Sequence, residues 1–224
     1  MIRYPLLLVN FKTYEQSTGE NAMTLTSKLE TIRDITGAEI AVAPQFYDLK
    51  ESSSMIPTFS QHIDPISYGS NTGSILPDAI RKTGACGTLL NHSERRIPMD
   101  VLQKSIQVAK ANDLIVCACA DSPETGEQIA RFPIAPDMIA VEPPELIGSG
   151  ISVSQAQPEI VSNSVEKIKA INQNIHVLCG AGVSTGEDVA KSISLGAEGV
   201  LVASAVVCSN DPKTIAKQMA EALK

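Results

Sequence analysis

The stretch Met138-Ile-Ala-Val-Glu142-Pro-Pro-Glu-Leu-Ile-Gly-Ser-Gly150 decides the fold class of this chain. It begins with four apolar residues, which is typical of a strand that is buried on both faces of a parallel sheet. The apolar run ends in the carboxylate of Glu142, and a loop with two prolines and two glycines follows. Parallel α/β folds place their chemistry at the carboxyl ends of their strands. Glu142 is therefore either a functional acid or an ordinary capping acid at the end of a strand.

The same unit, an apolar run followed by a turn and usually a helical segment, occurs eight times along the chain. The predicted strands cover residues 5–10, 39–43, 58–61, 85–90, 114–119, 138–142, 175–179 and 199–202. Helix N-termini are predicted at Ser122-Pro123, at Asp211-Pro212 and at Ser184-Thr-Gly-Glu187, which has the spacing of a capping box. No composition shift or linker marks a boundary. Eight such units predict an α/β fold, a single (β/α)₈ barrel domain over residues 1–224 with the helices outside the eight parallel strands.

Composition and charge narrow the possible partners. The net charge is −7 and no block of Lys or Arg exceeds two residues, so we expect neither a nucleic-acid nor an anionic-membrane partner. No apolar run approaches the ~18 residues of a membrane helix. The first apolar run, Leu6 to Val9, is too short for the core of a signal peptide. We therefore expect a cytoplasmic protein.

The five cysteines are an odd number and lie mostly inside apolar runs, which predicts reduced thiols in the core. Cys117 and Cys119 would share one face of a strand, but no second pair of Cys or His lies nearby to complete a zinc site. We expect no metal.

Polar or small residues follow five of the predicted strands, and a closed barrel brings those strand ends to one face. An ammonium, an imidazole and a carboxylate in one pocket can bind an anion, polarise a carbonyl and remove a proton. Each residue also has an ordinary alternative, such as a solvated lysine, a helix-capping histidine or a tight turn. The residues are Asn10, Lys12, His92, Glu94, Glu142, Gly180, Gly182, Ala203 and Ser204.

The turns after the seventh and eighth strands predict a phosphate site. Barrels usually bind phosphate there, with backbone N–H groups at the start of a short helix. Gly180 and Gly182 let the backbone approach an anion closely, and Ala203 and Ser204 are small enough to do the same.

Three segments, in this order, resemble the signatures of the triosephosphate isomerase family. They are Val9-Asn-Phe-Lys-Thr13, Asn91-His-Ser-Glu-Arg-Arg96 and Val141-Glu-Pro-Pro-Glu-Leu-Ile-Gly-Ser-Gly150. With the phosphate turns, the resemblance covers the whole chain. The compact length and the Cys179-Gly-Ala-Gly182 turn are most similar to the short archaeal form.

The resemblance implies an isomerase that interconverts dihydroxyacetone phosphate and D-glyceraldehyde 3-phosphate through an enediolate, with no cofactor and no metal. It implies Glu142 as the base and His92, kept neutral by a helix N-terminus, as the hydrogen-bond donor to the enediolate. This pairing of roles is the family's familiar example of pKa tuning. Lys12 would hold the phosphate with Asn10 beside the carbonyl, and Glu94 would pair with Lys12. Residues 143–150 would form a lid, with Ile147 and Gly148 against the phosphate.

The chain departs from the family pattern at several positions. Pro144-Glu145 stands where the lid commonly has Val-Trp, Gly182 stands where a serine is common, and Ala203-Ser204 replaces two glycines. These changes leave backbone N–H donors available, so the phosphate site is still expected, with side-chain contacts that differ from those of the family pattern.

The segment His62 to Ser74 resembles the family's dimerisation loop, which reaches into a neighbouring subunit beside Lys12. Its Ile63, Ile66 and Tyr68 suit a partner surface and predict a homodimer. Exposed apolar helix faces would pair two such dimers into a homotetramer. His62 and His176 are expected to be structural or exposed.

Two alternatives remain open. A Schiff-base aldolase would use Lys12 as its nucleophile, and a catalytically silent barrel would bind phosphorylated metabolites as a sensor. A sensor has no need of a base opposite its phosphate site, so the presence of Glu142 with Lys12 and His92 favours the isomerase.

Overall fold

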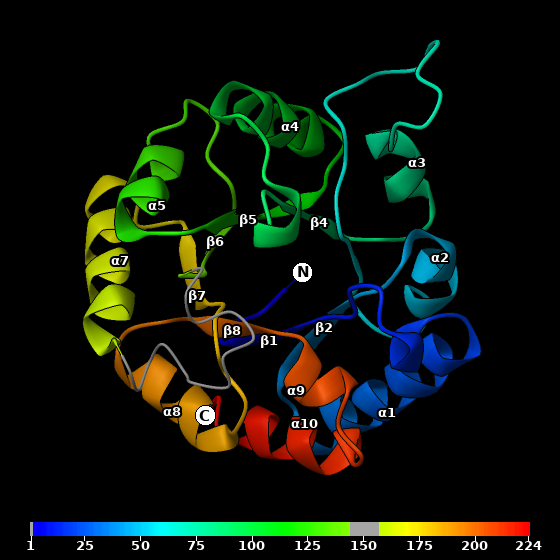
Figure 1. Cartoon of the computed structure of the whole chain (residues 1–224), viewed down its shortest axis with the longest axis vertical. Coiled ribbons are helices and arrows are strands. Elements are labelled where there is room, and N and C mark those ends of the chain that lie inside the picture. The colour runs from blue at the N-terminus through cyan, green and yellow to red at the C-terminus, as the bar shows by residue number, and fades with distance from the viewer. Residues whose placement is uncertain (1, 144–156) are drawn as a thin grey trace.

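The computed structural model of the chain describes residues 2–143 and 157–224. Figure 1 shows the strands around a common axis with the helices outside them. The strands are β1 (Leu6–Asn10), β2 (Glu39–Ala43), β3 (Phe59–Ser60), β4 (Gly87–Leu90), β5 (Ile115–Ala120), β6 (Met138–Val141), β7 (His176–Cys179) and β8 (Gly199–Val202). The helices are α1 (Glu20–Thr36), α2 (Leu49–Ser52), α3 (Pro77–Lys82), α4 (Met99–Ala111), α5 (Pro123–Ala130), α7 (Pro158–Ile171), α8 (Gly186–Ser194), α9 (Ser204–Val207) and α10 (Pro212–Glu221). Short 3₁₀ turns are η1 (Glu15–Ser17), η2 (Phe46–Asp48) and η3 (Ser93–Arg95).

The strands form one parallel sheet that is nearly closed into a barrel. The strand order is β2-β1-β8-β7-β6-β5-β4-β3, and each neighbouring pair in it is parallel. The remaining gap, between β2 and β3, is closed by a single parallel bridge between Val42 and Thr58. The predicted barrel of eight parallel strands is therefore confirmed, with a weak seam between β2 and β3 and a single paired position, Cys179 with Val200, between β7 and β8.

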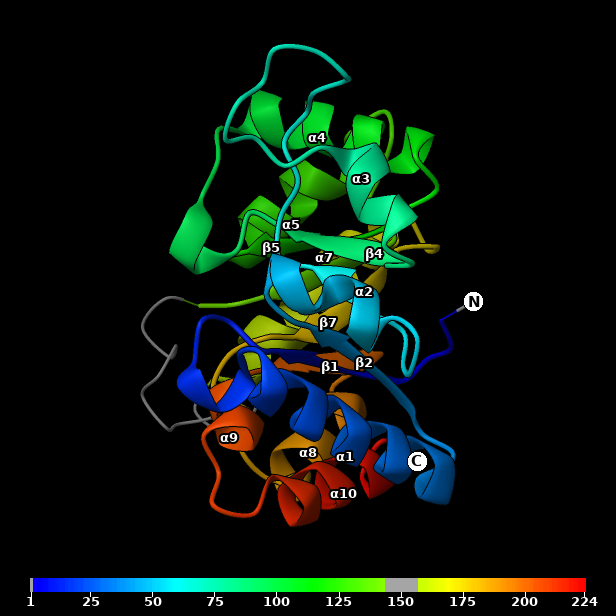
Figure 2. The same ribbon diagram turned by 90° about the vertical axis from the view of Figure 1, so that its right-hand side faces the viewer.

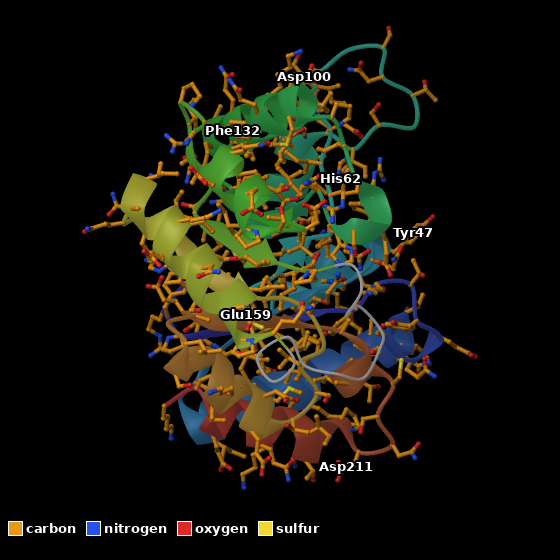
Figure 3. All side chains as sticks on the ribbon, turned by 60° about the vertical axis from the view of Figure 1, so that its left-hand side comes forward. Tyr47, His62, Asp100, Phe132, Glu159 and Asp211 are labelled. Atoms are coloured by element: carbon orange, nitrogen blue, oxygen red, sulfur yellow. The ribbon has the colours of Figure 1, made fainter. Side chains whose placement is uncertain are left out.

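The interior of the barrel is filled by alternate residues of the strands, because successive side chains of a strand point to opposite faces. The buried residues of this inner cluster include Leu6, Leu8, Ala41, Ala43, Phe59, Leu89, Cys117, Cys119, Met138, Ala140, Leu178 and Leu201. Side chains fill the space that the ribbon alone leaves open (Figure 3). Continued by two residues, the same alternation brings Asn10, Glu142, Gly180 and Ala203 to the carboxyl ends of their strands.

Two further clusters lie between the strands and the helices. One joins β1, β2, β7 and β8 to α1, α8, α9 and α10, and the other joins β4, β5 and β6 to α4, α5 and α7. Figure 2 shows α4 and α5 on one side of the barrel and α1, α8, α9 and α10 on the other. No helix of the described residues is long and apolar enough to cross a membrane.

The helix caps agree with the predictions at two of three positions. The hydroxyl of Ser122 accepts a hydrogen bond from the Thr125 N–H, and Asp211 caps α10 in the same way. The third prediction is wrong by one residue. The capping box of α8 consists of Thr185 and Asp188, because the helix begins at Gly186 and its third position is therefore 188.

The prediction that the cysteines are thiols in the core is confirmed for three of the five. Cys117, Cys119 and Cys179 are buried free thiols, whereas Cys86 is half-buried. Cys208 is exposed, since it follows the last turn of α9 at the surface.

Candidate active site

The three residues predicted to carry the chemistry meet at one end of the barrel. Nε2 of His92 lies 3.4 Å from Oε1 of Glu142. Lys12 lines the same small cavity, of about 40 Å³, together with Asn10 and Gly180. β1, β4 and β6 therefore deliver an ammonium, an imidazole and a carboxylate to one place.

Lys12 follows directly on β1 in an unusual backbone conformation. Its φ is 48°, in the left-handed region, which costs a non-glycine residue on the order of 1 kcal/mol or more. Its N–H donates to Oδ1 of Asn10 at 3.0 Å, and its ammonium lies 2.9 Å from Oε1 of Glu94. Its carbonyl accepts hydrogen bonds from Nε2 of Gln45 at 2.6 Å and of Gln61 at 2.9 Å.

Gln45 and Gln61 were not found by the sequence reasoning. A signal was present, because each comes within two residues of the end of a predicted strand, as Lys12 does. A glutamine in a loop is common, however, and nothing local indicates that two of them reach the same carbonyl oxygen.

Glu142 is almost completely buried. Burial raises the pKa of its carboxyl from 4.5 to about 7, although the nearby Cys119 thiol and the Lys12 ammonium act in the opposite direction. Its Oε2 has no hydrogen-bond partner among the described residues. A carboxylate with this pKa is well suited to accept and return a proton near neutral pH.

His92 caps the short turn η3. Its Nδ1 accepts a hydrogen bond from the backbone N–H of Glu94 at 3.2 Å, so the neutral ring carries its proton on Nε2, toward Glu142. The pKa of His92 is lowered well below 6.5, with burial as the largest cause and the Lys12 cation next. The helix N-terminus expected to keep the ring neutral is thus a single 3₁₀ turn, and burial is the larger effect.

The turns after β7 and β8 line a second pocket of about 260 Å³. It shares Lys12, Gly180 and Ala203 with the smaller cavity, so the two form one cleft. The remaining lining residues include Gly182, Ser184, Ser204 and Ala205. The first N–H groups of a helix lack partners within it, and α9 begins at Ser204. The pocket therefore has the donors expected of an anion site.

The two glycines of the first turn serve different purposes. Gly182 has a φ of 69°, which favours glycine. A Cβ at Gly180 would lie 2.6 Å from Cγ of Glu142, so a side chain there would displace the carboxylate.

Some expected residues lie elsewhere or outside the described residues. Ile147, Gly148 and the rest of the predicted lid after Pro143 fall outside them. His62 is buried and lies 3.3 Å from Asp64. His176 stacks on the ring of Tyr4 at the opposite end of the barrel, with its Nδ1 2.8 Å from Oε1 of Glu198.

One prediction about the loop that is expected to face a partner subunit is wrong. Ile63 is fully buried in the chain's own core and does not belong to an exposed surface, since it packs in the cluster around β4 to β6. Tyr68 is 68% exposed, and its hydroxyl is hydrogen-bonded to Asp78 and Lys82.

Comparisons with known proteins match one family over most of the chain. Residues 5–219 match the family model described as Triosephosphate isomerase. The triosephosphate isomerase of Methanothermus fervidus is 47% identical over 217 residues, which cover 96% of this chain and 97% of that protein. The enzyme of Methanobacterium bryantii is 47% identical over 211 residues, covering 93% and 92%.

A solved structure shows the same fold at much lower sequence similarity. The crystal structure of triosephosphate isomerase from Bartonella henselae superposes with a TM-score of 0.75 at 17% identity, covering 97% of this chain and 98% of that one. The extent of the family match and the identity to the two archaeal enzymes give the conclusion: this chain belongs to the triosephosphate isomerase family.

Proposed function

We propose that the chain interconverts dihydroxyacetone phosphate and D-glyceraldehyde 3-phosphate, without a cofactor, through the residues described above. The observation that carries the proposal is the buried carboxylate of Glu142, with a pKa of about 7, placed 3.4 Å from the proton-bearing Nε2 of His92. An isomerase of this kind needs one base and one neutral hydrogen-bond donor on the same substrate.

The reaction moves one proton between two carbons. Glu142 removes the proton from the carbon next to the carbonyl, and the electron pair of the broken C–H bond forms the carbon–carbon double bond of the enediolate. Nε2–H of His92 donates a hydrogen bond to the oxygen on which negative charge develops. The hydroxyl proton of the enediolate passes to the former carbonyl oxygen, so that this oxygen becomes the new hydroxyl and the other oxygen becomes the new carbonyl. Glu142 then returns its proton to the neighbouring carbon, and the protein ends in its starting state.

Lys12 supplies positive charge to both parts of the cleft, since it lines the small cavity and the larger pocket. We assign the substrate phosphate to the larger pocket, with backbone N–H groups of Gly182 and Ser204 as donors. Asn10 lies beside the reacting carbonyl, and Glu94 holds the Lys12 ammonium from outside at 2.9 Å. Ile147 and Gly148 would complete the phosphate site.

Replacing the base tests the proposal. General-base catalysis contributes about 10²–10⁴-fold, so Glu142→Gln should lower kcat for glyceraldehyde 3-phosphate by at least that much. Binding of a phosphate ligand should largely persist. Glu187→Gln, at an exposed carboxylate on α8, is the matched control and should keep full activity. Full activity in Glu142→Gln would refute the assignment.

The same assay separates the alternatives. A folded wild-type protein that binds triose phosphate without turning it over would indicate a sensor. Borohydride trapping of the substrate on Lys12 would indicate a Schiff-base aldolase, whereas the isomerase leaves nothing to trap. Members of this family are isomerases, and the alternatives are not favoured.

We also propose that residues 1–224 act as a single domain that assembles into a homodimer or homotetramer in the cytoplasm. The segment between β3 and α3 projects away from the barrel (Figure 1). Tyr47 is 94% exposed and Tyr68 is 68% exposed, which is unusual for large aromatic side chains. Sedimentation that finds a fully active monomer at micromolar concentration would contradict the proposed assembly.

A further inference from the structure

We infer that Gln45 and Gln61 are positioning residues for Lys12, and that their carboxamides hold its backbone in the conformation that aims the ammonium into the cleft. This inference rests on the proposed function, because that function gives the ammonium its role. It concerns the backbone of Lys12, whereas Glu94 acts on the side chain.

The first observation is the conformation of Lys12. A lysine rarely adopts a φ of 48°, and such a conformation persists only where the surroundings impose it. Neither its N–H nor its carbonyl belongs to a strand of the barrel, since β1 ends at Asn10. Side chains take both groups instead: Asn10 accepts from the N–H at 3.0 Å, and Gln45 and Gln61 donate to the carbonyl.

The second observation is that the two amides have a complete set of acceptors. An amide nitrogen has two hydrogens to donate. Nε2 of Gln45 lies 2.6 Å from the Lys12 carbonyl oxygen and 3.3 Å from Oε1 of Gln61. Nε2 of Gln61 lies 2.9 Å from the same carbonyl oxygen and 3.0 Å from the Ala43 carbonyl oxygen. Each hydrogen has its own acceptor, so the orientation of both amides is fixed.

The third observation separates positioning from simple stability. Gln61 donates to the backbone of β2 at Ala43 and so also supports the seam between β2 and β3. The described side-chain hydrogen bonds of Gln45 go only to Lys12 and to Gln61. A loss of activity on changing Gln45 would therefore act through Lys12, either directly or by way of Gln61.

The test is Gln45→Leu, which keeps the size of the side chain and removes its donors. A displacement of about 1 Å can cost a site ~10²-fold, so we expect kcat/KM for glyceraldehyde 3-phosphate to fall by about tenfold or more. Inorganic phosphate should compete less well by a similar factor. Gln107→Leu, at an exposed glutamine on α4, is the control and should match the wild type.

The decisive measurement is made in a background without the ammonium. In Lys12→Gln, the further change Gln45→Leu should lower kcat/KM by less than about twofold, whereas in the wild type it should cost tenfold. Gln45→Leu should remain folded at the assay temperature and keep the same oligomeric mass as the control.

Two results would overturn the inference. One is a Gln45→Leu variant as active as Gln107→Leu. The other is the same fold-loss in the Lys12→Gln background, which would show a structural effect. If the wild type does not turn over triose phosphate, the proposed function fails, and binding of inorganic phosphate then tests the inference alone: Gln45→Leu must weaken that binding only where Lys12 is present.

Discussion

As the proposed base, Glu142 should give the activity a defined pH dependence. The base works only as the carboxylate, and its pKa of about 7 in the unliganded protein predicts that kcat/KM rises as the pH increases through 7. The lowered pKa of His92 keeps the imidazole neutral around pH 7, so the ionisation of His92 does not add a second pH dependence to kcat/KM. A rate profile from pH 5 to 9 measures this. A profile that is flat below pH 7 would contradict the raised pKa.

Ionisation of Glu142 also lowers the free energy of unfolding, because the pKa of this carboxyl is higher in the folded state than in the unfolded state. A carboxyl whose folded-state pKa is raised from 4.5 to about 7 contributes its full stability below pH 4.5, and the contribution is lost as the pH rises through 7. At pH 8 the folded state loses on the order of 3 kcal/mol. Glu142→Gln carries no such charge. Urea unfolding should find it more stable than the wild type at pH 8, with the difference much reduced at pH 5, and equal differences at both pH values would contradict the account.

At the scale of residues, the sequence was most informative where short motifs carry chemistry. The structure brings Lys12, His92 and Glu142 together at one end of the barrel, because each follows a buried strand, and their catalytic roles stay predictions. The partners of the Lys12 carbonyl could not be predicted, because Gln45 and Gln61 reach it from two other loops. Ile63 was misplaced for a related reason, since an apolar residue in a polar loop can face either the core or the solvent.

At the scale of elements, the start of α8 gives a clear prediction. Thr185→Ala removes the cap of the Asp188 N–H and should cost about 1 kcal/mol of unfolding free energy. Asp188→Ala should cost more, because its buried carboxylate accepts from the N–H groups of Ser184 and Thr185 at 3.0 Å. Glu187→Ala, at the exposed neighbour, should change the stability by less than about 0.5 kcal/mol. Urea unfolding of the three variants measures these differences. A larger loss of stability for Glu187→Ala than for Asp188→Ala would support the capping box of Ser184 and Glu187 that the sequence predicts.

That prediction missed by one residue for a physical reason. Ser184 with Glu187 and Thr185 with Asp188 both have the spacing of a capping box, so the local pattern fits two helix starts. The choice depends on packing, because Asp188 is buried and Glu187 is exposed. The strands were easier to predict, because each one is a continuous apolar run that is visible in the sequence.

At the scale of the molecule, the barrel followed from repetition alone. Eight apolar runs with short connections leave few other ways to bury both faces of every strand. The unequal strength of the closure could not be predicted, because it depends on how far β3 runs beside β2. β3 has only two residues, and one bridge at Val42 and Thr58 joins the two strands.

This seam has a consequence for how the molecule opens. Local opening is easiest where the fewest backbone hydrogen bonds must break. The N–H of Val42 donates across the seam to the carbonyl oxygen of Pro57 at 3.0 Å. This amide hydrogen should therefore exchange with deuterated water well before the amide hydrogens that join β1 and β8. Gln61 and Lys12 lie at the same seam. On slow heating, turnover should therefore fade while the far-ultraviolet circular dichroism is still that of the intact barrel. Simultaneous loss of both signals would show that the seam opens only with the rest of the fold.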